Sequence, residues 1–199
     1  MKKAYLLPIA IVFVLATASI QNAFCPTSYP PAGTDHLEST TATIYLEITG
    51  RFTEIITARG PTDVSRSNPY DPGDGRFKID TEIVSMNLVG HSVNVGTVLI
   101  TESPTKVSAG AIQQHTAGID YPAESFFDVF IEIRAEALIG KFHNDDPKRM
   151  SAIIDRIPPY GSTYEGPQTI PLKNEQEATV GYMKPTTHKV DPVVGGIVV

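Results

Sequence analysis

Apolar and polar residues alternate with period two through much of the chain beyond residue 41, as in strands that bury one face. The clearest example is 126–135 (FFDVFIEIRA), where every odd position is apolar and the even positions, apart from Phe126 and Phe130, are charged. A helix would scatter this apolar set around its circumference, so the segment predicts a strand.

The same reasoning predicts further strands, separated by turn residues, at 43–48, 52–57, 77–89, 93–101, 169–172 and 178–184. The first two flank Thr49-Gly50-Arg51 and the last two flank a polar turn, so each pair is expected to form a hairpin. The apolar face of 77–89 shifts at Ile83 and Val84, which indicates a bulge or burial on both sides. Gly96 inside 93–101 suggests another bulge. The mixed segment 104–118 is expected to be a long loop with fragments of order.

One segment, 145–157 (DDPKRMSAIIDRI), has two interpretations. As a helix it would be capped by Asp146, with Pro147 in its first turn and apolar residues at i, i+3, i+4 and i+7. As a strand it would bury Met150, Ala152 and Ile154. The predicted fold class is therefore all-β, an antiparallel β-sandwich or open barrel with at most one short helix near 147–157.

Residues 1–23 have the order of an export signal: Lys2 and Lys3, an apolar run, and a small-residue end. Cleavage after Ala18 or after Ala23 fits the pattern, and retention as an uncleaved anchor is the alternative. The expected location is secreted, periplasmic or extracellular.

The remainder divides by composition into a Pro/Ser/Thr-rich linker at 24–40, a β-sandwich domain at 41–190 and an apolar tail at 191–199. Cys25 is the single cysteine, so no disulfide can form within the chain, and a free thiol in the linker is expected. Lipidation of Cys25 is disfavoured by Phe24 directly before it. Stability must therefore come from apolar burial, backbone ladders or a bound ion.

Without residues 1–23 the chain carries 14 basic and 22 acidic residues, a net charge of about −8. A domain of this sign repels nucleic acid and anionic lipid, so neither nucleic acid nor, after signal cleavage, a membrane is an expected partner. A protein or polysaccharide at the cell surface is the expected partner instead.

The sequence contains none of the common catalytic motifs of serine hydrolases, zinc peptidases, P-loop enzymes or dinucleotide-binding enzymes. The oxygen-rich segment around Asp71, Asp74 and Asp80 is a candidate calcium loop, although its spacing does not match an EF-hand. A Pro/Asp/Gly turn is the simpler explanation of the same residues. His143, Asp145 and Asp146 form a second acidic turn.

Four strings, 66–72 (RSNPYDP), 73–90 (GDGRFKIDTEIVSMNLVG), 125–132 (SFFDVFIE) and 144–164 (NDDPKRMSAIIDRIPPYGSTY), give the chain a resemblance to uncharacterised exported bacterial proteins, grouped as a domain of unknown function. The resemblance spans about 41–190 and implies an exported single domain. It brings no assigned activity and no catalytic residues.

Export, acidic composition and the missing catalytic motifs together predict a non-enzymatic β-domain with a structural or interaction role at or outside the cell surface. The alternative is an exported hydrolase or carbohydrate-active enzyme that uses acidic loop residues. No cofactor is expected, apart from calcium in the loop described above.

Overall fold

The computed structural model describes residues 27–194 and 197–198, which are all-β. The leader, both cleavage positions and Cys25 lie outside this range. Across the described residues, no helix has the length and apolar character needed to span a membrane.

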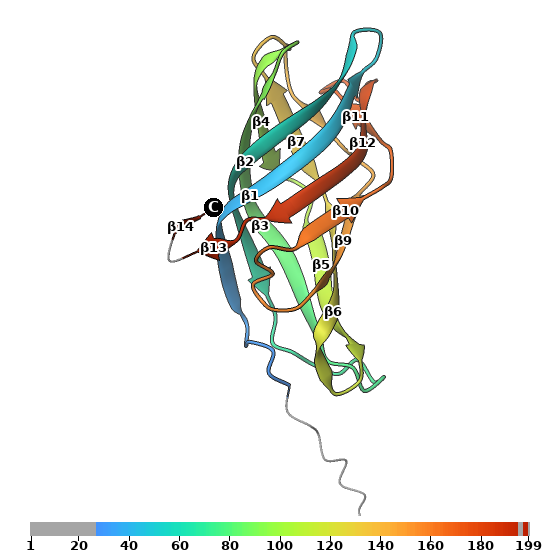
Figure 1. Ribbon diagram of the computed structural model, residues 1–199. Coiled ribbons are helices and arrows are strands. Elements are labelled where there is room, and N and C mark those ends of the chain that lie inside the picture. Colours follow the sequence, from blue (N-terminus) through green and yellow to red (C-terminus); the bar gives the residue numbers. More distant parts are fainter. Residues whose placement is uncertain (1–26, 195–196, 199) are drawn as a thin grey trace, which may run out of the picture.

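Fourteen strands follow one another within the described residues (Figure 1). They are β1 (Gly33–Ile48), β2 (Phe52–Arg66), β3 (Lys78–Ser92), β4 (Gly96–Glu102), β5 (Ser108–Thr116), β6 (Ile119–Val129), β7 (Ile131–Ala135), β8 (Phe142–His143), β9 (Lys148–Ile154), β10 (Thr163–Gly166), β11 (Ile170–Lys173), β12 (Thr179–Val190), β13 (Val193–Val194) and β14 (Ile197–Val198). The first twelve form one antiparallel sheet, and β13 pairs with β14 in a separate hairpin.

The twelve-stranded sheet closes on itself, because β1 pairs with β2 on one side and with β12 on the other. Two long strands, β3 and β12, each change partner part-way along their length. β3 pairs with β5 through its first half and with β4 through its second, while β12 pairs with β11 and then with β10. The wall opposite β1 and β2 therefore consists of two sets of short strands, β4–β7–β8–β11 toward one end and β5–β6–β9–β10 toward the other (Figure 1).

A continuous apolar core fills the closed sheet. In β1 the buried positions alternate as Thr40, Ala42, Ile44, Leu46 and Ile48, with more exposed residues between them. Burying every second side chain of each strand in this way is the main favourable contribution to folding in a chain without a disulfide.

The all-β antiparallel class is confirmed, and so are the two hairpins, although three of their four strands, β1, β2 and β12, are longer than expected. The shift at Ile83 and Val84 is a bulge: Asp63 pairs with Ser85 and Val64 with Ile83, which leaves Val84 as the extra, exposed residue. Of the two predicted architectures, sandwich and open barrel, one sheet wrapped around one core is closer to the barrel.

Five expectations need correction. Segment 104–118 is not mainly loop, because β5 pairs with both β3 and β6 although Ser108, Ala109 and Gly110 have low strand propensity. The helix at 145–157 does not form, since Lys148–Ile154 pairs with β6 along its whole length. Residues 93–95 form a turn, and Gly96 begins β4 with a φ of 75°.

The fourth correction concerns 126–135, which is two strands instead of one. The ladder breaks at Phe130, whose N–H donates to Ser108 Oγ (2.9 Å), while the N–H of Ile131 donates to Asn144 Oδ1 (2.8 Å). The alternation nevertheless survives the break, because Phe127, Val129 and Ile133 are all buried.

The described part of the 24–40 segment is not a linker in the structural sense, since β1 begins at Gly33. Ahead of β1, the carboxylate of Asp120 accepts hydrogen bonds from the hydroxyls of Thr27 and Ser28 (2.7 and 2.5 Å). Tyr29 is buried and packs edge-on against Tyr121. These contacts attach the lead-in to the β5–β6 end of the sheet, and composition alone could not reveal them.

Candidate functional site

Two hollows adjoin each other on the outer face of the sheet. One has a volume of about 540 Å³ and the other about 350 Å³, and Glu165 lines both. We call them together the outer groove. Its lining comprises Glu124, Ser125, Phe126, Arg149, Ser151, Ala152, Ile153, Thr163 and Glu165 on one side and Thr43, Tyr45, Ile55, Gly166, Pro167, Pro185, Thr186 and Thr187 on the other.

The groove runs across the strands, because its central residues are register partners. Phe126 faces Ser151, Ser151 faces Glu165, Glu165 faces Thr187, and Thr187 faces Thr43. Five strands are crossed in this row, β6, β9, β10, β12 and β1, so at about 4.8 Å per strand the row extends roughly 19 Å. That length suits an extended ligand better than a compact one.

The surface is hollow here because the sheet is poorly continuous at β10. Only one residue pair, Glu165 with Ser151, joins β10 to β9. Pro185 lies at an irregularity in the pairing of β1 with β12. Fewer ladder bonds leave the depression open.

The polar groups along the row are available to a ligand. Within residues 27–194, the hydroxyls of Thr43, Ser151, Thr163 and Thr187 make no side-chain hydrogen bond, and the carboxylate of Glu165 has neither a hydrogen bond nor an ion pair. Glu165 is exposed and lies where the two hollows meet. An anionic acceptor is thus flanked on both sides by hydroxyl groups.

Arg149 forms a rigid end of the groove. Its guanidinium donates two hydrogen bonds to Asp128, from Nε at 2.6 Å and from Nη2 at 2.9 Å, and lies 3.9 Å from the centre of the Phe126 ring. A bidentate pair combined with a cation–π contact fixes both the charge and the ring in place. The other carboxylate of the groove, Glu124, contacts His115 Nδ1 at 2.8 Å.

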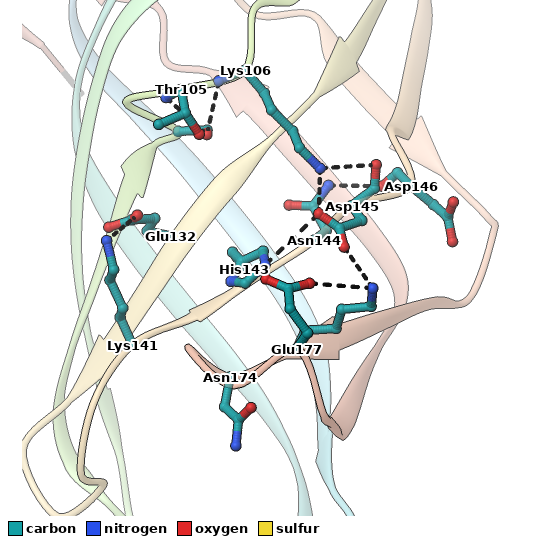
Figure 2. A network of polar contacts seen from close by, with 12 residues as sticks. Thr105, Lys106, Glu132, Lys141, His143, Asn144, Asp145, Asp146, Asn174 and Glu177 are labelled. Atoms are coloured by element: carbon teal, nitrogen blue, oxygen red, sulfur yellow. Dashed lines mark hydrogen bonds and ion pairs between the residues drawn. The ribbon is translucent and has the colours of Figure 1, made fainter.

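A second polar cluster lies around β8, outside the groove (Figure 2). His143 pairs across the strands with Glu132 on β7 and with Lys173 on β11. Its Nε2 is 3.7 Å from Asp145 and 3.5 Å from Glu177. The three potential metal-ligand atoms of His143, Asp145 and Glu177 lie within 4.8 Å of one another.

Lysines already neutralise this cluster. Figure 2 shows the ammonium group of Lys106 directed at Asp145. Lys173 Nζ lies 2.6 Å from the other carboxylate oxygen of Asp145. The hydrogen bonds from Lys106 and then Lys173 hold the pKa of Asp145 far below its ordinary value, so this carboxylate stays ionised. A divalent cation would have to displace both ammonium groups, so the geometry favours an ion-pair network over a metal site.

The interior contains two smaller cavities, of about 30 and 40 Å³, lined mostly by apolar residues. His188 and Met150 line both of them, and Lys148 lines the first. Typical ligand pockets measure roughly 300–1,000 Å³, so the outer groove matches the size of a ligand site and these two interior cavities do not.

The position of His188 between the cavities predicts an acid-sensitive fold. Burial lowers the pKa of His188 to about 4, and the nearby charge of Asp191 opposes this with a smaller effect. Two other titratable residues, Lys148 and Tyr164, line these cavities. The folded state therefore prefers neutral His188, and the unfolding free energy should fall as pH drops from about 6.5 to about 4, by up to ~3 kcal/mol. Urea titrations across this range would measure the decline.

His188→Asn should flatten that pH dependence, whereas the same substitution at the exposed His91 should leave it intact. Carboxylates with lowered pKa values, such as Asp145 and Asp191, also contribute to stability, but this contribution is lost only at lower pH, when they become protonated. They therefore affect the unfolding free energy in a different pH range. An unchanged slope between pH 6.5 and 4.5 in the His188 variant would contradict this assignment.

The candidate calcium residues do not converge. Asp71 accepts the backbone N–H groups of Gly73 and Gly75 (2.8 and 3.0 Å), which is what a turn-forming aspartate does. Asp74 pairs with Arg76, and Asp80 contacts Lys78 and Tyr70. Calcium binding by this loop stays a prediction. In the acidic turn, Asp145 and His143 do meet, but Glu177 takes the place expected for Asp146.

The groove residues were not identified from the sequence. Ser151, Glu165 and Thr187 are ordinary polar residues on the outer face of three different strands. Their outward orientation follows from period two, but their alignment depends on the register between strands, which no local pattern encodes.

The family of the protein follows from a comparison with known sequences. A family model matches residues 19–192, which is most of the chain. The protein belongs to the family of unknown function DUF6073. This agrees with the resemblance that the four sequence strings indicated, which likewise implied no activity. No curated protein matches this DUF6073 member.

A similar solved structure is DynF from the dynemicin biosynthesis pathway of Micromonospora chersina. The two chains are 21% identical, with a TM-score of 0.71, and the match covers 80% of each. At this level of identity the likeness establishes a shared fold for the DUF6073 protein and nothing about its activity.

Proposed function

We propose that this protein is an exported, non-enzymatic binding domain whose outer groove holds an extended, hydroxyl-rich polysaccharide. The observation that carries the proposal is the unpartnered carboxylate of Glu165 at the junction of the two hollows, within a row of unpartnered hydroxyls. Sugar hydroxyls both donate and accept hydrogen bonds, so they complement a carboxylate and threonine or serine hydroxyls alike. A position outside the cell, expected from the leader, would place the groove among such polymers.

The charge of the domain narrows the range of possible ligands. A net charge of about −8, together with carboxylates in the groove, repels acidic polymers. The proposal is therefore for a neutral or amino-sugar polysaccharide, and acidic polysaccharides and nucleic acid serve as negative controls.

The test is a pull-down of the mature chain on insoluble neutral and amino-sugar polysaccharides, with affinity electrophoresis in soluble glucans. Glu165→Gln keeps the shape but removes the charge, and it should weaken binding about tenfold, since a hydrogen bond to a charged group contributes roughly 1.5–3 kcal/mol. Glu175→Gln, an exposed glutamate outside the groove, is the matched control and should bind like the parent.

Thermal unfolding of both variants should match the parent, because neither side chain is buried. The proposal would be contradicted if the parent bound none of these polysaccharides, or if the parent and Glu165→Gln bound them equally. Binding of the domain to a protein partner, without binding to any polysaccharide, would also contradict it.

One observation supports the enzymatic alternative. Glu124 and Glu165 both line the 540 Å³ hollow, and glycoside hydrolysis uses two carboxyl groups that face one linkage. The same incubations, assayed for new reducing ends, distinguish the two functions. Release of sugars that disappears in both Glu124→Gln and Glu165→Gln would establish a hydrolase, whereas retention without release supports the binding domain.

A further inference from the structure

Lys148 is a buried lysine without a counter-ion. It lies on β9, is only 2% exposed and lines the 30 Å³ cavity. Its Nζ donates to two backbone carbonyls, those of Gln168 and of Lys184 (2.9 Å for the latter), and none of the carboxylates in residues 27–194 pairs with it. Gly166 makes room for it, since a Cβ there would approach Lys148 Cε to 2.9 Å.

The hydrogen bonds match the neutral form of this amine. A neutral primary amine has two N–H bonds and a lone pair, whereas an ammonium has three donors. Two carbonyl acceptors satisfy the neutral amine and would leave one donor of the ammonium unsatisfied. Burial lowers the pKa of Lys148 to about 8, and no neighbouring charge opposes it, so a sizeable fraction is neutral near pH 7 to 8.

The cavity next to Lys148 is small and is lined mostly by apolar side chains. Met86, Leu88 and Met183 line the same cavity, and Met150 and His188 separate it from the 40 Å³ cavity. Thioether side chains adapt readily to an occupant, but the total space suits a molecule of only a few heavy atoms. Within the described chain the imidazole of His188 makes no hydrogen bond, so it is available for proton transfer.

From this geometry we infer that Lys148 is a covalent modification site, a nucleophilic amine that condenses with a short aliphatic aldehyde in the interior. The amine nitrogen forms a bond to the carbonyl carbon, and the proton it loses passes to the carbonyl oxygen, giving a carbinolamine. Loss of that hydroxyl as water, with His188 as proton donor and acceptor, leaves the imine. Aldehyde and amine thus give imine and water, with no oxidant or reductant. The site is separate from the outer groove and does not depend on the proposed function.

The test is reductive trapping in the folded, mature chain. Propanal and cyanoborohydride at pH 7 convert each imine to a stable propyl-lysine, and peptide mapping by mass spectrometry gives the rate at each lysine. We expect Lys148 to react at least about tenfold faster than the exposed Lys189, because burial favours the neutral, nucleophilic form of the Lys148 amine. The preference should disappear in denaturant, where all lysines become equivalent.

Three variants and a larger probe complete the experiment. His188→Asn should slow labelling of Lys148 without affecting Lys189. Lys148→Met should remove the fast label alone, and Lys173→Met, at a lysine in the β8 cluster, should leave it unchanged. Octanal, which exceeds the space, should lose the preference for Lys148. A Lys148 that reacts no faster than Lys189 in the native unsubstituted chain would overturn the inference, whatever the variants do.

Discussion

Replacing Gly60 with alanine is expected to destabilise the domain by about 4 kcal/mol or more, enough to unfold a protein of ordinary stability in part or entirely. A Cβ on Gly60 would overlap the carbonyl oxygen of Asn87 and lie 3.0 Å from the Asn87 carbonyl carbon and 3.2 Å from Leu88 Cα. These are backbone atoms of β3, so no side-chain rotation can relieve the overlap. Far-UV circular dichroism and urea unfolding followed by tyrosine fluorescence would measure the loss.

Gly33→Ala is the matched control, because its added Cβ would meet only the guanidinium of Arg66, with Nη2 at 3.1 Å. The end of a flexible side chain can move away, so this variant should unfold within about 1 kcal/mol of the parent. If Gly60→Ala lowered the unfolding free energy as little as Gly33→Ala, β2 and β3 could separate at little cost. The close approach of Gly60 to the backbone of Asn87 would then be wrong.

The second large effect is expected at Asn144. Its buried side chain accepts the N–H of Ile131 (2.8 Å) and donates to the carbonyls of Val129 (2.9 Å) and Asp146 (2.8 Å). Alanine at this position would remove one partner from each of three backbone groups, two of which flank the break between β6 and β7. We expect a loss of about 3 kcal/mol in unfolding free energy, since each unsatisfied buried group costs about 1–3 kcal/mol and the effects are not additive.

Asn174→Ala provides the comparison, because Asn174 also accepts two backbone N–H groups, from Gln176 and Ala178, but in an exposed turn where water can replace it. Hydrogen–deuterium exchange adds a local measurement: the amide of Ile131 should exchange faster in Asn144→Ala than in the parent. Similar stability of the two alanine variants, or unchanged exchange at Ile131, would show that Asn144 does not hold the strand break together.

Asn144 illustrates what local patterns miss. The alternation in 126–135 predicted correctly which side chains are buried, because the inward side of a strand is encoded by period two. The pattern did not predict the break at Phe130, since Ser108 and Asn144, which satisfy the freed N–H groups, come from distant parts of the chain.

β5 and β9 illustrate the same limit for whole elements. Small residues at the start of β5 gave little apolar signal, and 145–157 fitted a helix as well as a strand. In both cases pairing with β6 decides, because ladder bonds and burial outweigh the weak intrinsic preferences of these segments.

The candidate sites depend even more strongly on the tertiary structure. The sequence drew attention to acidic residues close together along the chain, and those in the Asp71 loop bond to their own turn. The groove instead assembles single residues from β6, β9, β10, β12 and β1, and the interior lysine occupies a position that its charge would assign to the surface.

The sequence by itself therefore determined the all-β class, most strand positions, the inward faces and the absence of an internal disulfide, because these depend on nearest-neighbour alternation and composition. Only the tertiary structure decided the closure of β1 on β12, the exchange of partners along β3 and β12, and the alignment of Ser151, Glu165 and Thr187. The physical reason is that register and closure are set by hydrogen bonds between segments far apart in the chain, and a shift of one residue would turn every groove side chain to the opposite face.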